Sequence, residues 1–329
     1  MLAAQEGHVS NMFSIPRLNA ASITLCFTIL FLCNCALAVG QTLTVVSSAT
    51  YEGVPADATG FPYVASGSIV SMFAPNIATA NASATDPPPA PLPTNLGGVS
   101  ATIMDASGKV QQIGLAVVTP GQVNAVLPNV ATGLATVDLT TSTGAHVTGQ
   151  VNIEAVDAGL FSADQTGNWL AAAQVVTTHA DGSQTILGSI ATCTGNLAYN
   201  GFTWSPCVPI PINLGLSTDQ VVLELFGTGL RGINAIPPPP QEAPGTPNIW
   251  INVTTYGDGC GDGGCGQANL QVLYLGPQGA GAPGSFYGLD QVNVLLPQSL
   301  AGSGITSLGV GYNDVFTSSG SNGVFIYVQ

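Results

Sequence analysis

Basic residues are almost absent from this chain of 329 residues, which has three Lys and Arg together against 17 Asp and Glu. The formal net charge of -14 repels phosphate backbones and anionic membrane surfaces, so nucleic-acid binding is excluded as a function class. Charged residues make up only 6% of the chain, far below the roughly 25% of an average soluble domain. Solubility must therefore depend on Ser, Thr, Asn, Gln and exposed backbone.

Sustained helical periodicity with capping residues is also missing. The 41 Gly and 23 Pro residues instead mark frequent turns between short apolar runs. The length is enough for about two domains. Short strands separated by Gly and Pro turns predict an all-β chain of antiparallel β-sandwiches, with packed inner faces and polar outer faces.

Catalytic signatures are scarce as well. His146 and His179 are the histidines beyond the N-terminal leader, and neither lies in a Gly-x-Ser-x-Gly or similar setting, so we interpret both as exposed turn residues. The acidic side chains of Glu154, Asp157 and Glu224 are scattered and cannot be paired into a glycosidase site. We therefore predict that the protein is not an enzyme, with no catalytic residues and no cofactor.

The N-terminus carries a targeting pattern. Arg17 precedes an apolar run at 23–32, and Ala36-Leu37-Ala38 follows. A basic residue, a short apolar core and an A-x-A site are typical of a secretory signal peptide, which we predict over 1–38. An uncleaved membrane anchor is the second interpretation and lipidation of Cys35 the third, so membrane contact is expected only if the leader remains. The predicted location is extracellular or in the cell envelope.

Four cysteines remain after removal of this leader: Cys193, Cys207, Cys260 and Cys265. An even number in an exported chain favours disulfides. Of the three possible pairings, Cys193 with Cys207 and Cys260 with Cys265 is the simplest, because each pair brackets a loop rich in Gly or Asn. A zinc site at Cys260 and Cys265 is the alternative, but no histidine lies near. The nearby Asp258 is part of a loop with too few acids for an EF-hand, so no metal site is predicted.

One stretch is repeated in the chain. Residues 119–128 contain a turn, Gln-Val-Asn, an apolar alternation and Pro, and residues 288–297 contain the same order. The Gln and Asn amides are expected to bond to neighbouring turn backbone. Other segments correspond in the same order: 221–227 with the strand ending at Phe73, 248–254 with 99–104, and 267–275 with 110–118. We predict two β modules related by internal duplication, at 39–162 and 163–329, with hairpin and disulfide-loop insertions in the second.

Five motifs resemble the Solibacter-type uncharacterised C-terminal domain, a family found on many secreted acidobacterial proteins. They are ASGSIVSMF at 65–73, PLPTNLGGV at 91–99, TPGQVN at 119–124, FGTGL at 226–230 and QVNV at 291–294. The chain departs from the family at Ser66, where Pro is usual, and at 157–161, which replaces an Ala-Pro-Gly-Ile-Phe type segment. The resemblance implies that the two sandwiches are Ig-like modules of an exported protein, and it implies no activity.

The expected function is a secreted, non-enzymatic role in cell-surface or extracellular interactions, with an unidentified protein or polysaccharide as partner. A carbohydrate-binding module, or part of a glycan-degrading system, is the alternative, because exposed aromatic rings on a β-sandwich can stack on sugars. Trp204 and Tyr199, both between Cys193 and Cys207, are the candidate ligand-binding pair.

Overall fold

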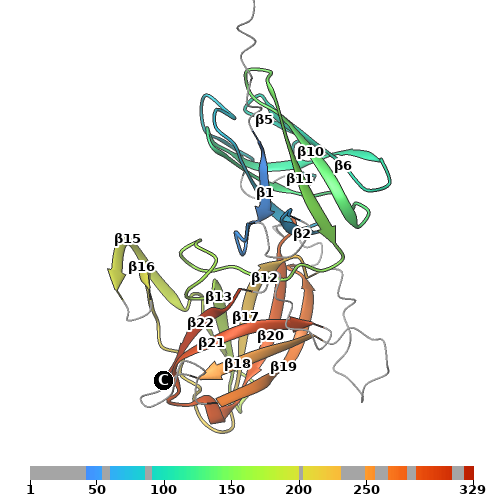
Figure 1. The fold of residues 1–329 in the computed structure, drawn as a ribbon. Helices are drawn as coiled ribbons and strands as arrows, with labels where there is room; N and C mark the ends of the chain where they lie inside the picture. The colour runs from blue at the N-terminus through green and yellow to red at the C-terminus, as the bar shows by residue number, and fades with distance from the viewer. Residues whose placement is uncertain are drawn as a thin grey trace, which may run out of the picture. The chain divides into compact units, whose positions relative to one another are not determined.

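The computed structural model of the chain divides into two units, Met1–Gly40 and Gln41–Gln329. It describes residues 42–53, 60–85, 91–199, 203–230, 249–255, 266–279, 287–312 and 322–329, and the predicted signal segment lies outside them. The regular elements of these residues are β-strands, together with one 3-10 turn at Gln298–Leu300 (Figure 1). None of the described residues belongs to a helix that could span a membrane. The all-β prediction is confirmed.

The described residues of the first sandwich form eleven strands. They are β1 Thr44–Ser47, β2 Tyr63–Ala65, β3 Ile69–Phe73, β4 Ala82–Ser83, β5 Asn95–Leu96, β6 Val99–Met104, β7 Val110–Gln112, β8 Gly114–Val118, β9 Gln122–Val126, β10 Gly133–Thr140 and β11 His146–Glu154. One sheet has the order β1-β3-β9-β8-β4, and the other has the order β2-β11-β10-β6-β5, with β7 beside β6. Read as strands A to G, these are the ABED and GFC sheets of a constant-type immunoglobulin fold.

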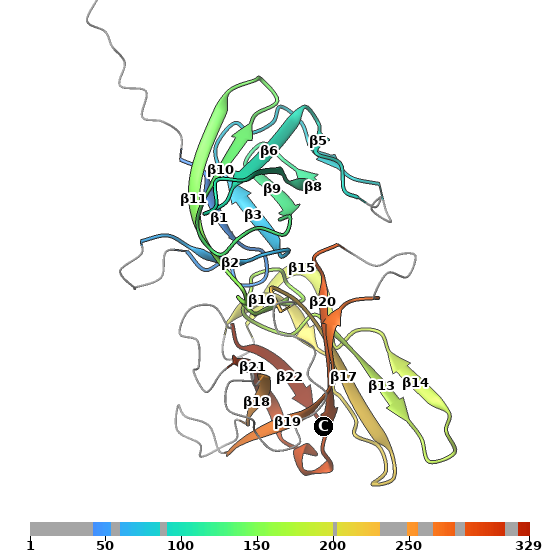
Figure 2. The same cartoon turned by 90° about the vertical axis from the view of Figure 1, so that its right-hand side faces the viewer.

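Alternating side chains explain why these strands form a sandwich. In β6, Val99, Ala101 and Ile103 are buried, whereas Ser100 and Thr102 are only partly buried on the opposite face. Successive side chains of a strand point to opposite faces of the sheet, so the apolar set faces the second sheet. Figure 2 shows the β3, β8 and β9 layer beside the β6, β10 and β11 layer.

The second sandwich repeats this order. Its strands are β12 Gly159–Leu160, β13 Ala173–Thr178, β14 Gln184–Leu187, β17 Gln220–Thr228, β18 Ile249–Thr255, β19 Gly266–Pro277, β20 Asp290–Leu296, β21 Gly304–Tyr312 and β22 Val324–Val328. They run in the order β14-β13-β17-β20-β19-β18-β21-β22, with β12 beside β17. The A, B, E and D positions are β13, β17, β20 and β19, and the C, F and G positions are β18, β21 and β22. The first part of β19 pairs with β18 and its second part with β20, so this strand continues from one sheet into the other.

The internal duplication is confirmed by the register. Strands β9 and β20 carry the two Gln-Val-Asn stretches, and each lies antiparallel to its B strand. Gln122 lies opposite Phe73, and Gln291 lies opposite Phe226. The two repeats therefore correspond in strand order and in the register of their B and E strands.

The prediction that the repeated amides bond to turn backbone is wrong. The Gln122 amide Nε2 donates to Asn124 Oδ1 at 2.7 Å, and the Gln291 Nε2 donates to Asn293 Oδ1 at 2.8 Å. Residues two apart in a strand share one face, so the two amides are neighbours and satisfy each other. The Asn124 Oδ1 also accepts the Ser71 hydroxyl at 3.1 Å, which links the pair to the adjacent strand.

Each sandwich has its own apolar core. The first core includes buried residues from Leu43 to Ile153, and the second includes buried residues from Ala158 to Val328. The predicted module limits, 39–162 and 163–329, stay a prediction, since both sides of 162 belong to the same compact unit.

Buried hydrogen bonds join the two sandwiches at a set of residues that we call the junction: Ile69, Asp157, Thr228, Gly229 and Gly288. The Ile69 N–H donates to Thr228 Oγ1 at 2.8 Å, and the Thr228 hydroxyl donates to the Gly288 carbonyl at 2.8 Å. The Asp157 N–H donates to the Gly229 carbonyl at 3.1 Å. Gly229 has a φ of +79°, and a Cβ there would collide with the Asp157 carbonyl, so this position requires glycine.

A second connection is made by the side chain of Asn322. Its Oδ1 accepts the Leu160 N–H at 2.9 Å, and its Nδ2 donates to the Leu160 carbonyl at 2.6 Å. The same Nδ2 reaches the carbonyls of Gly167 and Ala49, the latter at 3.3 Å. Asn322 is only 9% exposed, and it joins Ala49, which follows β1 in the first sandwich, to Leu160 and Gly167 at the start of the second. We call this set of contacts the Asn322 clamp.

Candidate functional site

A two-stranded hairpin is inserted between β14 and β17. It consists of β15 Ala191–Tyr199 and β16 Trp204–Pro209, which pair only with each other among the described strands. Cys193 lies directly opposite Cys207, with their Cα atoms 4.0 Å apart, and the two form a disulfide. The predicted pairing is confirmed for this bridge, although the sequence suggested a loop where the structure has paired strands. Cys260 and Cys265 lie outside the described residues.

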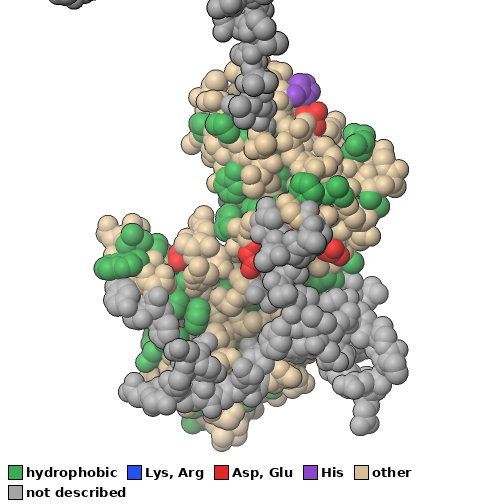
Figure 3. All heavy atoms as spheres, in the orientation of Figure 1, with side chains coloured by type: hydrophobic (Ala, Val, Ile, Leu, Met, Phe, Trp, Pro, Cys, Tyr) green, Lys and Arg blue, Asp and Glu red, His purple; other side chains and the backbone are tan. Residues whose placement is uncertain are grey.

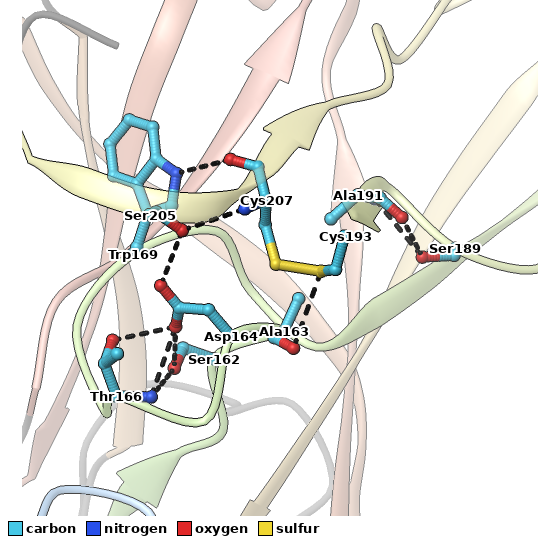
Figure 4. Close-up of a disulfide and its surroundings, with 10 residues drawn as sticks. All are labelled: Ser162, Ala163, Asp164, Thr166, Trp169, Ser189, Ala191, Cys193, Ser205 and Cys207. Carbon is cyan, nitrogen blue, oxygen red and sulfur yellow. Dashed lines mark hydrogen bonds between the residues drawn. A yellow bond between two sulfur atoms is a disulfide. The ribbon is translucent and has the colours of Figure 1, made fainter. Parts of the chain in front are cut away.

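The inner face of the hairpin is fixed to the second sandwich. Cys207 and Ser205 are fully buried, and the Cys207 carbonyl accepts the indole N–H of Trp169 at 3.4 Å (Figure 4). The Ser205 hydroxyl donates to Asp164 Oδ2 at 2.7 Å. Trp169 is 1% exposed and packs on Phe325 of β22, with ring centroids 5.1 Å apart. Packing and hydrogen bonds therefore hold β16 to the second sandwich, and the disulfide ties β15 to β16.

Asp164 lies in the loop between β12 and β13 and connects this loop to the β15–β16 hairpin. Burial by itself would raise the pKa of Asp164, but hydrogen bonds from Thr166, Ser205 and Ser162 outweigh it and hold the pKa below its ordinary value. The carboxylate is therefore ionised at neutral pH, and the charge strengthens the hydrogen bonds that it accepts.

Removing the disulfide should weaken the protein without unfolding the sandwiches. The bridge closes a sequence separation of 14 residues, so the double variant Cys193→Ala/Cys207→Ala should lose about 3 kcal/mol of unfolding free energy. The buried Trp169 remains to hold the inner face, so the far-ultraviolet circular dichroism spectrum should stay β-rich. Chemical denaturation of the two proteins measures the difference. Loss of the β spectrum in the variant would show that the hairpin is required for the sandwich itself.

The outer face of the hairpin is apolar and exposed. Leu197 is 68% exposed, Trp204 is 64% exposed and Val208 is 44% exposed. We call these three residues the apolar hairpin face, and Figure 3 shows hydrophobic side chains gathered over β15 and β16. The register places the backbone of Tyr199 opposite Trp204, which brings the predicted pair together in the strand pairing.

The sequence did not single out Leu197 and Val208. The signal for Val208 was present, because Trp204, Pro206 and Val208 alternate with the buried Ser205 and Cys207 along β16. The signal for Leu197 was hidden, because the register shifts between Cys193 and Ala198 and breaks the alternation.

The two histidines differ in their surroundings. His146 is exposed on β11, and its Nδ1 lies 3.0 Å from Asp138 Oδ1, in line with its interpretation as a surface residue. The interpretation is too simple for His179, whose Nδ1 lies 3.2 Å from Asp219 Oδ2 and whose Nε2 lies 3.3 Å from Thr185 Oγ1.

The contacts of His179 have the order of an acyl-transfer relay, in which a carboxylate orients a histidine beside a hydroxyl. Thr185, however, lies on β14, an exposed strand at the end of the sheet, and its neighbour Ile186 is 66% exposed. A substrate at this hydroxyl would be open to water. We interpret His179 as a structural residue whose hydrogen bonds connect the β13–β14 hairpin to the turn at Asp219.

The acidic residues do not assemble into a metal centre in the part of the chain that is described, where no group of three or more His, Cys, Asp or Glu could hold an ion. Glu224 on β17 accepts a hydrogen bond from Gln174, and Glu154 ends β11. Asp157 belongs to the junction. Asp258 lies outside the described residues.

No family model and no curated protein matches this chain. Among solved structures, a similar chain is the one titled "Crystal structure of DIP-gamma IG1+IG2", which is 10% identical over 87% of this chain and 95% of that chain, with a TM-score of 0.17. A likeness at this score carries no argument. The class of protein defined by the strand order is a tandem Ig-like β-sandwich that bears an apolar, disulfide-bonded hairpin.

Proposed function

We propose that this chain is an exported, non-enzymatic interaction protein that contacts its partner through the apolar hairpin face. The observation that carries this proposal is the exposure of Leu197, Trp204 and Val208 on a hairpin whose strand β16 is held to the second sandwich through the buried Ser205 and Cys207. A fixed surface loses little conformational entropy on binding, and a Trp side chain supplies a large contact area.

Export is part of the proposal. The leader pattern at 1–38 and the disulfide between Cys193 and Cys207 both support it, because disulfides persist in oxidising compartments. The low charge content supports a partner that is recognised through apolar and hydrogen-bonding contacts, because steering by opposite charge is available only toward cationic surfaces.

A protein is the partner that the hairpin face favours. Trp is a typical central contact residue of protein interfaces, and the exposed Leu197 and Val208 extend the apolar area of the hairpin. A sugar is the second candidate, and the observation that favours it is Trp204 itself, whose exposed ring could stack on a pyranose.

Photo-cross-linking tests the proposal. A benzoylphenylalanine at Val208, in protein exported with its own leader, should cross-link to a discrete protein in the envelope or medium of the organism that encodes the chain. The same probe at Ile186 is the matched control, because this residue is similarly apolar and is 66% exposed on another element. Equal cross-linking from both positions would contradict the proposal, and recovery of the chain only inside cells would contradict export.

Substitution of Trp204 should weaken binding strongly. We expect Trp204→Ala to raise the dissociation constant for the cross-linked partner by at least about tenfold, because a central Trp contributes about 2 kcal/mol or more. Surface plasmon resonance measures the change, with Ile186→Ser as the control. Retention of the wild type on insoluble cellulose, chitin or xylan, lost in Trp204→Ala, would favour the carbohydrate-binding alternative instead.

A further inference from the structure

Asp157 is an acidic residue buried in the junction. It follows the last strand of the first sandwich and precedes β12, and its backbone N–H donates to the Gly229 carbonyl. Asp157 is 7% exposed, and no hydrogen bond acts on its carboxyl group to offset this burial. A buried carboxylate without a partner is costly, whereas the protonated acid is tolerated.

The charged groups around Asp157 are also acidic. Glu52 follows β1 and Glu154 ends β11, and their charges act on Asp157 together with its burial. On the side of the second sandwich, the Asp290 carboxylate accepts the N–H of Leu230, the residue after Gly229. The only described Lys or Arg residue is Lys109, in the turn between β6 and β7. Arg231 lies outside the described residues.

We propose that Asp157 makes the junction a pH-sensitive joint, which is tight in acid and opens progressively as the solution becomes neutral and then weakly alkaline. The closed joint holds the carboxyl group with its proton, away from water and near other negative charges. The open joint exposes the carboxyl group, which then ionises like any solvated aspartate. Rising pH therefore favours the open joint, because only the open state releases the proton easily.

The pH range over which the joint opens follows from the pKa of Asp157 in the closed state and in the open state. Burial, followed by the charges of Glu52 and Glu154, raises the pKa of Asp157 to about 8 in the closed state. An exposed aspartate has a pKa of about 4. A group whose pKa is higher in the closed state than in the open state gives the closed state its full stabilisation at pH values below the open-state pKa. This stabilisation declines as the pH rises from about 4 to about 8. In this window the opening equilibrium should rise about tenfold per pH unit, and it should level off above pH 8.

Burial also raises the pKa of Glu52, so this neighbour acts in the same direction as Asp157, whereas acidic groups with lowered pKa values act outside this window. Hydrogen bonds from Ser107 lower the pKa of Asp105 to about 2, and hydrogen bonds from Ser183 lower the pKa of Asp181. The stability that these two groups add is lost only in more acidic solution, as the pH falls through their lowered pKa values. A change between pH 5 and pH 8 therefore distinguishes Asp157 from them.

Amide hydrogen exchange tests the joint directly. The N–H groups of Asp157 and Ile69 bond across the junction, so their exchange reports its opening. After correction for the intrinsic base catalysis of exchange, the wild-type opening constant should rise about tenfold per pH unit between pH 5 and pH 8. In Asp157→Asn, which cannot ionise, the opening constant should not depend on pH. Asp181→Asn is the matched control and should follow the wild type.

Several outcomes would overturn the proposal. A pH-independent opening constant in the wild type, or an unchanged pH dependence in Asp157→Asn, would show that Asp157 does not control the joint. Protection restored at pH 8 by millimolar CaCl₂ would show that the carboxylate holds a cation instead. If Asp157→Asn fails to fold, Glu52→Gln decides the matter: removing this neighbouring charge should lower the opening constant at pH 8, and an unchanged constant would refute the joint.

Discussion

Replacing Asn322 with Ala should lower the free energy of unfolding by about 3 kcal/mol. The substitution removes the Asn322 clamp, and it leaves the N–H and carbonyl of Leu160 and the carbonyl of Gly167 without their partner. Each buried backbone group without a partner costs about 1–3 kcal/mol, and the small size of Ala leaves little for a compensating contact. Urea denaturation followed by tryptophan fluorescence measures the loss.

The matched control for this variant is Asn168→Ala. Asn168 is an exposed asparagine in the loop next to Gly167, so its removal should change the stability by less than about 0.5 kcal/mol. Equal stability of Asn322→Ala and the wild type would mean that water satisfies the freed backbone groups, and the clamp would then be energetically unimportant.

Replacing Trp169 with Ala should have an effect of similar or larger size. Trp169 is 1% exposed and forms the centre of a small core with Leu170, Ala191 and Cys207. Removing such a side chain typically costs about 3–5 kcal/mol, because a cavity remains after the apolar contacts are lost. The hydrogen bond to the Cys207 carbonyl is lost as well. Chemical denaturation measures the total effect.

Two further variants test whether the loss of stability comes from the volume of the buried Trp169 side chain. Trp169→Phe keeps much of the volume and loses the indole N–H, so it should cost clearly less than Trp169→Ala. Trp204→Ala removes an exposed indole from the same hairpin and should leave stability almost unchanged. Comparable losses for Trp204→Ala and Trp169→Ala would contradict the distinction between the inner and outer faces.

Local sequence patterns were sufficient to predict the class of fold and the duplication. Alternation with period two identified strands such as β6 and β9, and Gly and Pro marked the turns between them. The disulfide was also predictable, because Cys193 and Cys207 bracket a short segment and need only a hairpin to meet. The exposure of Trp204 follows from its place on the face of β16 opposite the buried Cys207.

Contacts between distant residues could not be predicted in this way. Thr228 and Asn322 look like ordinary polar residues at strand ends, and their buried hydrogen bonds depend on how the two sandwiches meet. The burial of Asp157 could not be predicted either, because its backbone N–H bonds to the distant Gly229 across the junction. The contact between His179 and Asp219 was missed because it joins turns that are 40 residues apart.

The Asn322 clamp also bears on the order of folding. Its contact with Ala49 joins residues 273 positions apart, whereas the hairpins of each sandwich close over short distances. Loop-closure entropy makes such a distant contact slow to form, so we expect it to appear only after both sandwiches have folded. Asn322→Ala should then speed unfolding and leave the refolding rate nearly unchanged, which stopped-flow kinetics can measure on the same variant. During synthesis, the first sandwich must therefore fold and persist without the clamp until Asn322 has emerged.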